Sequence, residues 1–276
     1  MDDLVSTGWL EQQLGSPDLA ILDASLFMPA DGRDPEAEFF AAHIPGARRF
    51  DIESLSDHED PAPHMLPGAT AFGAAMVALG VGRDDRIVLY DDSPLHSATR
   101  GWFMLRHYGA DRVAILDGGL AKWRTEGRPL ERGKATPRRA RFDAVERGTI
   151  VTRMMLVRGV GSSLLDARAR ARFDGSVPDP RPGVAAGHIP GARNLPFGDL
   201  YRADGTLKPD DALAAEFTAA GVDPQSAFVA TCGSGVTATS LLFAARRLGG
   251  RDARLYDGSW SDYGADPATL KASGST

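Results

Sequence analysis

The chain repeats itself, and this repeat constrains its fold more than any other feature of its 276 residues. The hexapeptide HIPGAR occurs at His43–Arg48 and again at His188–Arg193, an offset of 145 residues. Three further pairs match in the same order: ILDAS with LLDAR, GVGRDDRIVLYD with GVDPQSAFVATC, and ILDGG with LYDGS. A period this long lies far outside the range of solenoid repeats. The sequence therefore predicts a duplicated domain.

Both copies have the same order of predicted elements. A short apolar strand ends in Asp, a loop carries the HIPGAR turn, and then come a helix, a second strand, another helix and a third strand ending in Asp-Gly. The second strands are predicted at 86–91 and 227–232. Short apolar strands that alternate with helices are typical of parallel sheets. We expect an α/β fold of two tandem domains, each a mostly parallel sheet flanked by helices.

The two copies are predicted to join in a charged segment, 124–148, which has eight basic residues, four acidic residues and two prolines. We place the first domain at 1–130, a linker at 131–148 and the second domain at 149–276. Runs of charge are mostly solvated. The favoured interpretation is a solvated connector that crosses the other domain's surface, and the alternative is a strip that binds an anion or a partner.

Composition excludes several classes of protein. A net charge of −6 argues against non-specific nucleic-acid binding, and one cysteine precludes an intrachain disulfide and fits a reducing compartment. The first residues, MDDLVSTGWL, do not resemble a signal peptide, so we expect a cytoplasmic protein. The uncharged stretch 226–245 is better explained by a strand, a polar turn and a helix than by a membrane span. No HExxH motif or cluster of His and Cys predicts a metal, and no cofactor is expected.

The single cysteine, Cys232, ends a predicted strand, and a helix is expected to begin near Val236. This geometry would aim backbone N–H groups and the positive end of the helix dipole at the sulfur. Gly233 and Gly235 lack Cβ atoms, so the loop can curl with its amides inward. The pattern predicts a nucleophilic thiol in an anion-binding loop.

The competing interpretation is a buried, inert cysteine. Two observations weigh against it: a Gly-Ser-Gly turn follows the cysteine, and the equivalent residue of the first copy is Asp91, which no core role explains. A protein-phosphatase loop would need Arg six residues after the cysteine, where Ala238 stands. There is no Cys-x-x-Cys pair either.

The duplicated α/β pattern, HIPGA in each half, a thiol in the second half alone and the segment CGSGVTA together resemble the tandem-domain rhodanese superfamily. The match runs from about Asp23 to Tyr263. CGSGVT, at Cys232–Thr237, is similar to the 3-mercaptopyruvate sulfurtransferase branch. The thiosulfate branch usually has basic residues at the positions of Gly233 and Ser234, which suit a dianion, whereas a neutral loop suits a monocarboxylate.

The resemblance implies a set of site residues. Arg172 and Arg181 match two arginines that hold the donor, and two guanidinium forks suit the carboxylate and ketone of a 2-oxo acid. The predicted loop contacts of the donor are Gly233, Gly235, Val236 and Thr237.

The branch is also thought to use a serine-protease-like trio, which maps to Ser234, His64 and Glu53. The acid is commonly Asp, so Asp51 is an alternative to Glu53. The active site would then lie between the two domains. His96, which stands where an aromatic or Phe-Ser loop is frequent, is expected to alter donor preference.

The expected reaction moves sulfur from 3-mercaptopyruvate to Cys232 as a persulfide, releases pyruvate, and passes the sulfur to cyanide or a thiol such as thioredoxin. Two alternatives stay open. The chain could be a thiosulfate sulfurtransferase, or a persulfide carrier that turns over neither small donor.

Overall fold

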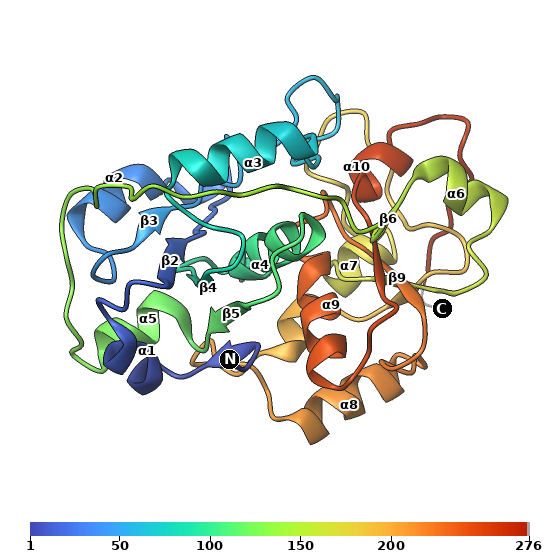
Figure 1. Cartoon of the computed structure of the whole chain (residues 1–276). Helices are drawn as coiled ribbons and strands as arrows, with labels where there is room; N and C mark the ends of the chain where they lie inside the picture. The colour runs from blue at the N-terminus through green and yellow to red at the C-terminus, as the bar shows by residue number, and fades with distance from the viewer. Residues whose placement is uncertain (275–276) are drawn as a thin grey trace. The chain divides into compact units, whose positions relative to one another are not determined.

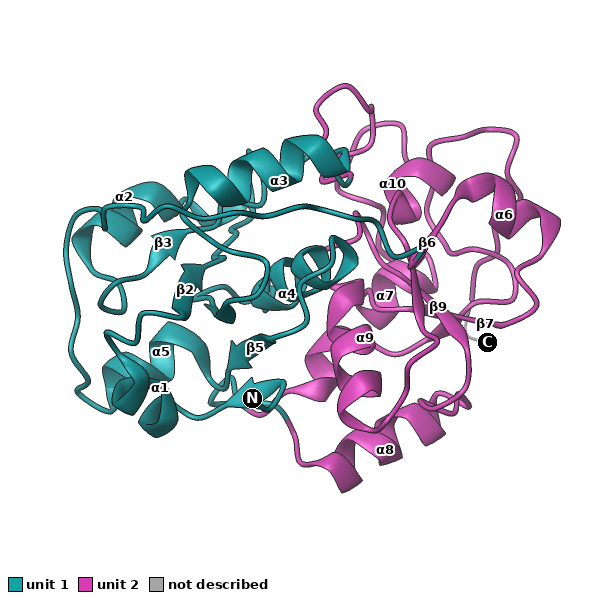
Figure 2. Ribbon diagram, viewed as in Figure 1, with its two compact units in different colours: residues 1–56, 66–148, 203–207 teal, residues 57–65, 149–202, 208–276 magenta. Residues whose placement is uncertain are grey.

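A computed structural model describes residues 1–274 as two compact units, coloured separately in Figure 2. The first unit comprises 1–56, 66–148 and 203–207, and the second comprises 57–65, 149–202 and 208–276. The short segment 57–65, which contains His64, thus belongs to the second unit although it precedes most of the first unit's chain.

Each unit is built on a parallel sheet of five strands within the described residues. The first has the order β1-β5-β4-β2-β3, with β1 Leu4–Val5, β2 Leu19–Asp23, β3 Arg48–Arg49, β4 Arg86–Tyr90 and β5 Val113–Leu116. The second has the order β6-β10-β9-β7-β8, with β6 Ile150–Val151, β7 Ser163–Asp166, β8 Arg193–Asn194, β9 Phe228–Thr231 and β10 Arg254–Tyr256. The predicted fold class is confirmed.

Helices cover both faces of the first sheet (Figure 1). They are α1 Thr7–Gln13, α2 Pro35–Ala41, α3 Ala69–Ala78, α4 Ala98–His107 and α5 Gly119–Thr125, with a 3₁₀ turn at Pro29–Asp31. The first, second and fifth pack Leu10, Phe39 and Trp123 against one face of β4 and β5. On the other face, α4 crosses β4 at Gly101, where an added Cβ would lie 2.3 Å from the Leu89 side chain.

The second sheet is covered in the same way. Its helices are α6 Arg153–Arg158, α7 Arg170–Phe173, α8 Asp210–Ala219, α9 Ala238–Arg247 and α10 Ser259–Tyr263, with a 3₁₀ turn at Phe197–Leu200. Phe173 of α7 and Trp260 of α10 share a buried cluster with Val229 of β9. The next strand residue back, Phe228, contacts Phe217 of α8, with ring centroids 5.9 Å apart. Because strand side chains alternate between faces, α8 covers the face opposite to that cluster.

The repeated HIPGAR segment has the same structural role in both units. His43 pairs its backbone N–H and C=O with Glu131, at 3.0 and 2.8 Å, and His188 pairs with Ala272, at 2.8 and 2.9 Å. Nδ1 of each buried ring lies 2.8 Å from a carbonyl oxygen, of α2 in the first unit and of α7 in the second. Each histidine therefore ties the end of a helix to a later part of its own unit.

The segment 131–148 lies along the first unit. Val145 donates a backbone hydrogen bond to Tyr108, at 3.1 Å, and the Phe142 ring meets Phe72, with centroids 5.7 Å apart. Arg147 forms an ion pair with Asp111 at 2.7 Å. Most of the segment is exposed, as its charge predicts, but the partners named above all belong to the first unit rather than to the other domain. The domain boundaries given above stay a prediction.

The sequence pattern predicts three strands per copy, and the described residues of each unit add two strands at the sheet edges. These are β1, β3, β6 and β8, and each has two residues. Two residues give no periodicity to detect. None of the helices within residues 1–274 is long and apolar enough to cross a bilayer.

Candidate active site

Cys232 directly follows β9, at the carboxyl end of a central strand of the second sheet. Its side chain is buried, with 1% of the residue exposed. The loop 233–237 leads into α9, which begins at Ala238, two residues later than expected. Ligands of parallel α/β sheets bind at this end of the strands, so the cysteine stands at the edge where chemistry is expected.

The backbone carbonyl groups of Cys232 and Gly233 accept hydrogen bonds from the first residues of α10. Trp260 donates its backbone N–H to the Cys232 oxygen at 3.0 Å. Ser261 donates its N–H, at 2.9 Å, and its hydroxyl, at 2.6 Å, to the Gly233 oxygen, which also accepts from Nη1 of Arg181 at 2.7 Å. In a trans peptide the C=O and the following N–H point in opposite directions. The N–H groups of Gly233 and the next residue therefore point away from α10.

Four N–H groups of the loop remain as donors. Within residues 1–274, no described acceptor takes the backbone N–H of Gly233, Ser234, Val236 or Thr237. They stand at the N-terminus of the ten-residue helix α9, where the positive end of the dipole lies. Clustered N–H donors of this kind favour an anion. The loop is thus built to stabilise negative charge next to Cys232.

The side chain of Ser259 binds the backbone of the same loop. Its hydroxyl accepts the N–H of Cys232 and of Gly235, both at 3.1 Å, and donates to the Tyr256 carbonyl at 2.8 Å. Ser259 is fully buried and has a φ of 50°, in the left-handed region that non-glycine residues rarely adopt. Its counterpart in the first unit is Gly119, with a φ of 56°. The serine tolerates strain there and supplies an acceptor that a glycine lacks.

Replacing Ser259 is expected to separate the hydroxyl from the backbone strain. Ser259→Ala keeps the strain and removes the hydroxyl that accepts the N–H groups of Cys232 and Gly235, so we expect a loss of about 2–4 kcal/mol in the free energy of unfolding. Ser259→Gly removes the strain and should lose about 1 kcal/mol less. Urea denaturation measures both values, with Ser226→Ala in an exposed turn as control. Equal stability of Ser259→Ala and the unmodified protein would contradict the assignment.

The two predicted donor-binding arginines lie together beside the loop. Nη2 of Arg172 and Nε of Arg181 donate to the carboxylate of Asp179, at 2.6 and 2.7 Å. Burial alone would raise the pKa of Asp179, but hydrogen bonds from Arg181 and Arg172 outweigh it and lower that pKa to about 2. A Cβ added to Gly233 would lie 3.2 Å from Nη2 of Arg181 and 3.6 Å from Nη2 of Arg172. Both guanidinium groups thus border the residue after Cys232.

His64 and Ser234 also meet. Nδ1 of His64 lies 2.8 Å from the hydroxyl oxygen of Ser234, 170 residues away in the chain. His64 has a φ of 62°, a rare conformation for a non-glycine residue. Such strain is found where the surroundings fix a side chain. The partner of His64 here, Ser234, stands two residues after Cys232.

The acid of the predicted trio stays a prediction. Glu53 belongs to the first unit and His64 to the second. Asp51 accepts the backbone N–H of Glu53 at 3.2 Å and the hydroxyl of Ser54, so its carboxylate is committed to the local turn. His96, for which a role in donor preference is predicted, has its pKa lowered to about 4 by burial.

The equivalent loop of the first unit is filled by ion pairs. Asp91 stands in the place of Cys232, and its backbone oxygen accepts from the start of α5 at 2.9 Å as that of Cys232 does from α10. Asp92, in the place of Gly233, pairs with Arg33 at 3.0 Å and Arg124 at 2.8 Å. The hollow beside it measures about 10 Å³, no more than about one water. Burial raises the pKa of Asp91 to about 7.

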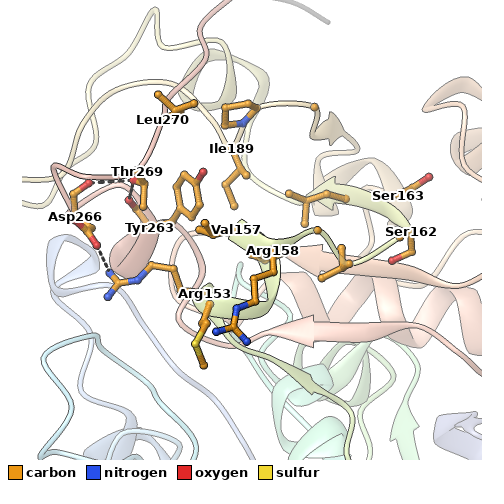
Figure 3. Close-up of a pocket in the computed structure, with 18 of the residues that line it drawn as sticks. Arg153, Val157, Arg158, Ser162, Ser163, Ile189, Tyr263, Asp266, Thr269 and Leu270 are labelled. Carbon is orange, nitrogen blue, oxygen red and sulfur yellow. Dashed lines mark hydrogen bonds and ion pairs between the residues drawn. The ribbon is translucent and has the colours of Figure 1, made fainter.

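A much larger hollow of about 1240 Å³ lies elsewhere in the second unit, and Figure 3 shows it lined by Val157, Ile189, Tyr263 and Leu270. It is bordered by Ser163, at the start of β7, and by Ala227, just before β9. These residues mark the amino ends of the strands, opposite to the Cys232 loop. None of the predicted site residues lines this hollow.

Fold and loop together define a class of protein: a duplicated parallel α/β domain whose second copy has a cysteine loop at the carboxyl end of a central strand. The chain belongs to the rhodanese family, because the rhodanese-like domain matches residues 6–126 and again 153–266.

Individual relatives match almost the whole chain. The 3-mercaptopyruvate sulfurtransferase of Escherichia coli K12 is 42% identical, over 95% of this chain and 94% of the relative. The human 3-mercaptopyruvate sulfurtransferase is 41% identical, over 94% and 91%. The crystal structure of SseA, a 3-mercaptopyruvate sulfotransferase from Escherichia coli, superposes with a TM-score of 0.86 at 39% identity, covering 94% of this chain and 99% of SseA.

Two residues of this site escape the sequence argument. Asp179 lies in the segment PDPRPG, where it precedes Arg181, and a lone acid in an arginine-rich segment is a weak indication of a shared counterion. Ser259 is the one difference between the Asp-Gly-Gly of the first copy and the Asp-Gly-Ser of the second. Comparing the two copies position by position would have found it.

Proposed function

We propose that this chain is a 3-mercaptopyruvate sulfurtransferase, which moves sulfur from its donor to a thiol or cyanide through a Cys232 persulfide. The observation that supports it best is the pair Arg172 and Arg181, set against Gly233 in the loop that begins with Cys232. Relatives named 3-mercaptopyruvate sulfurtransferase, at 41–42% identity, support the same assignment.

The donor binds through its oxygen atoms. The two guanidinium groups receive the carboxylate and the ketone of 3-mercaptopyruvate as planar, charge-assisted hydrogen bonds, which fix the plane of the 2-oxo acid. Because both groups border Gly233, the donor's thiol carbon is held next to Cys232. Positioning of this kind converts an encounter between two molecules into a reaction within one complex.

In the first half-reaction the Cys232 thiolate attacks the sulfur of the donor. A sulfur–sulfur bond forms, the carbon–sulfur bond breaks, and its electron pair remains on the carbon as the enolate of pyruvate. Protonation of that carbon releases pyruvate. The N–H groups of Gly233, Ser234, Val236 and Thr237 stabilise the thiolate and then the persulfide.

His64 and Ser234 are the proposed path of the proton. Their contact at 2.8 Å lets the imidazole and the hydroxyl exchange a proton beside the loop. Glu53 is the proposed carboxylate that orients His64.

In the second half-reaction an acceptor attacks the outer sulfur of the persulfide, and Cys232 leaves as the thiolate. Cyanide becomes thiocyanate, and a reduced thiol such as that of thioredoxin becomes a persulfide, from which a second thiol displaces the outer sulfur as sulfide to leave a disulfide. Because the sulfur rests on the enzyme between the two steps, ping-pong kinetics are expected. A cytoplasmic location completes the proposal, supported by a single cysteine that no intrachain disulfide engages.

A second donor is the main alternative. The Arabidopsis thaliana relative named thiosulfate/3-mercaptopyruvate sulfurtransferase 1 is 36% identical over 96% of this chain and 77% of the relative. A neutral Gly233-Ser234 pair beside Cys232 favours the singly charged donor over thiosulfate.

Steady-state turnover with each donor, with cyanide as acceptor, tests the proposed function. We expect kcat/KM for 3-mercaptopyruvate to exceed that for thiosulfate by about 100-fold or more, since a cost of about 3 kcal/mol is ordinary for a mismatched charge. Preference for thiosulfate would reverse the donor assignment. Slow turnover of both, with Cys232 persulfidated by a desulfurase, would instead indicate the carrier.

A further inference from the structure

Resting on the proposed function, we infer that Asp179 selects a singly charged sulfur donor, because it positions Arg172 and Arg181 and cancels one of their two positive charges. Asp179 does not touch the reacting atoms in this assignment. It is a positioning residue that sets the charge of the donor site.

The carboxylate of Asp179 is shared by both arginines. Arg181 approaches it side-on, with Nε at 2.7 Å and Nη2 at 2.9 Å from the two oxygens, and its backbone N–H adds a third contact at 3.1 Å. Nη2 of Arg172 lies 2.6 Å from the second oxygen. The Asp179 side chain is 1% exposed, whereas those of the two arginines are 29% and 27% exposed. The carboxylate lies beneath, and the guanidinium groups reach the surface of the site.

These contacts engage Nε and Nη1 of Arg181, the latter also with the Ser261 hydroxyl, and leave one N–H of its Nη2 for a donor, whereas Arg172 contacts Asp179 through Nη2. Arg181 uses Nη1 to hold the Gly233 carbonyl, at 2.7 Å, so its plane is fixed by Asp179 on one side and by the Cys232 loop on the other. A guanidinium held on both sides loses little freedom when a donor binds. Without Asp179, both side chains would lose the anchor that aligns them.

The charges of the cluster can be counted. Two guanidinium groups and one carboxylate carry a net charge of +1, and Asp179 stays ionised at any working pH because its pKa is about 2. 3-Mercaptopyruvate carries one negative charge near neutral pH, and thiosulfate carries two. 3-Mercaptopyruvate would neutralise a cluster of charge +1, whereas thiosulfate would leave one excess negative charge. Such a difference in charge balance makes a site bind one of two related ligands more tightly.

The first unit supplies an internal comparison. Nη1 of its Arg33 donates to the Asp92 carbonyl at 2.9 Å, as Nη1 of Arg181 does to Gly233. There the two arginines, Arg33 and Arg124, meet two carboxylates, of Asp92 and Glu38, so the cluster is neutral. Its hollow is about 10 Å³. The same place in the fold thus has one more carboxylate where no donor is bound and one fewer where a donor is expected.

The test is the donor preference of Asp179→Asn, which keeps the size of the side chain and removes its charge. We expect the ratio of kcat/KM for thiosulfate to that for 3-mercaptopyruvate to rise about tenfold or more, through a lower KM for thiosulfate and a higher KM for 3-mercaptopyruvate. Asp199→Asn is the matched control, since Asp199 pairs with the exposed Arg170 at 2.9 Å and should leave the ratio unchanged. Asp179→Glu, which keeps the charge, should move the ratio less than Asp179→Asn.

Inhibition by anions provides a second readout, in the unmodified enzyme first and then in Asp179→Asn. Pyruvate, a monoanion, should inhibit at a lower concentration than sulfate, and Asp179→Asn should reverse that order. Two results would overturn the inference while leaving the enzyme a mercaptopyruvate sulfurtransferase. One is an equal fall in kcat/KM for both donors in Asp179→Asn, and the other is stronger inhibition of the unmodified enzyme by sulfate than by pyruvate. If the unmodified enzyme does not turn over 3-mercaptopyruvate, the proposed function itself fails. Should Asp179→Asn not fold, as circular dichroism would show, the inhibition order decides.

Discussion

Cys232→Ser is expected to abolish sulfur transfer, with kcat/KM lower by about 10⁴-fold or more for any donor. The hydroxyl is close in size to the thiol, so the buried position should accept it, but at neutral pH it supplies almost no anionic nucleophile and cannot hold a transferable sulfur. Intact mass spectrometry after exposure to the donor should show one added sulfur atom on the unmodified chain and none on the variant.

The control for this experiment lies in the first unit. Asp91→Asn changes the residue equivalent to Cys232 and should leave turnover in place, because its loop is filled by the ion pairs of Asp92. Retained turnover in Cys232→Ser, or an added sulfur on it, would remove the cysteine from the mechanism. A variant that fails to unfold with the same midpoint as the unmodified protein would be replaced by Cys232→Ala.

Arg181→Lys is expected to have the next largest effect, a loss of about 100-fold in kcat/KM for 3-mercaptopyruvate. Lysine keeps the charge but has no planar fork, so it cannot hold Asp179 side-on, the Gly233 carbonyl and the donor together. Two charge-assisted hydrogen bonds of about 1.5–3 kcal/mol each account for the size of the loss. Because the Gly233 carbonyl belongs to the cysteine loop, kcat should fall as well as the affinity for the donor.

Arg172→Lys separates binding from loop geometry. Arg172 contacts Asp179 and borders Gly233 but makes no described hydrogen bond to the loop, so its replacement should raise KM and change kcat little. Arg170→Lys, two residues earlier on the same helix with a side chain 70% exposed, is the control and should match the unmodified enzyme. A similar loss of kcat/KM in Arg170→Lys and Arg172→Lys would indicate a general effect on α7 rather than an effect on donor binding.

Sequence reasoning succeeds here where a property is local or repeated. The strands β2, β4 and β5, and their copies, are apolar runs bounded by helices, and the duplication makes each prediction twice. The loop after Cys232 is predicted because glycine placement and a helix start are written in consecutive residues. The two-residue edge strands escape, since they exist only through pairing with β5, β2 and their copies.

The parts that sequence reasoning misses depend on distant contacts. Ser259 acts through N–H groups 27 and 24 residues earlier in the chain, and no local pattern announces that meeting. Asp179 stands two residues before Arg181, but its importance comes from the second arginine and from burial, which follow from the packing of the segment. A conformation such as φ of 50° at a serine cannot be inferred from its neighbours in sequence.

The filled loop of the first unit shows that two copies of a domain can share an architecture while one of them lacks the thiol loop of the other. The first unit has the same sheet order, the same HIPGAR contacts and a loop at the same strand end as the second unit. The space that a ligand would need is taken, however, by Asp91, Asp92, Arg33 and Arg124. Placing a thiol there by Asp91→Cys alone would therefore create a cysteine without a donor site. The charges of this salt-bridge network would have to be removed before a nucleophile in the first unit could meet a donor.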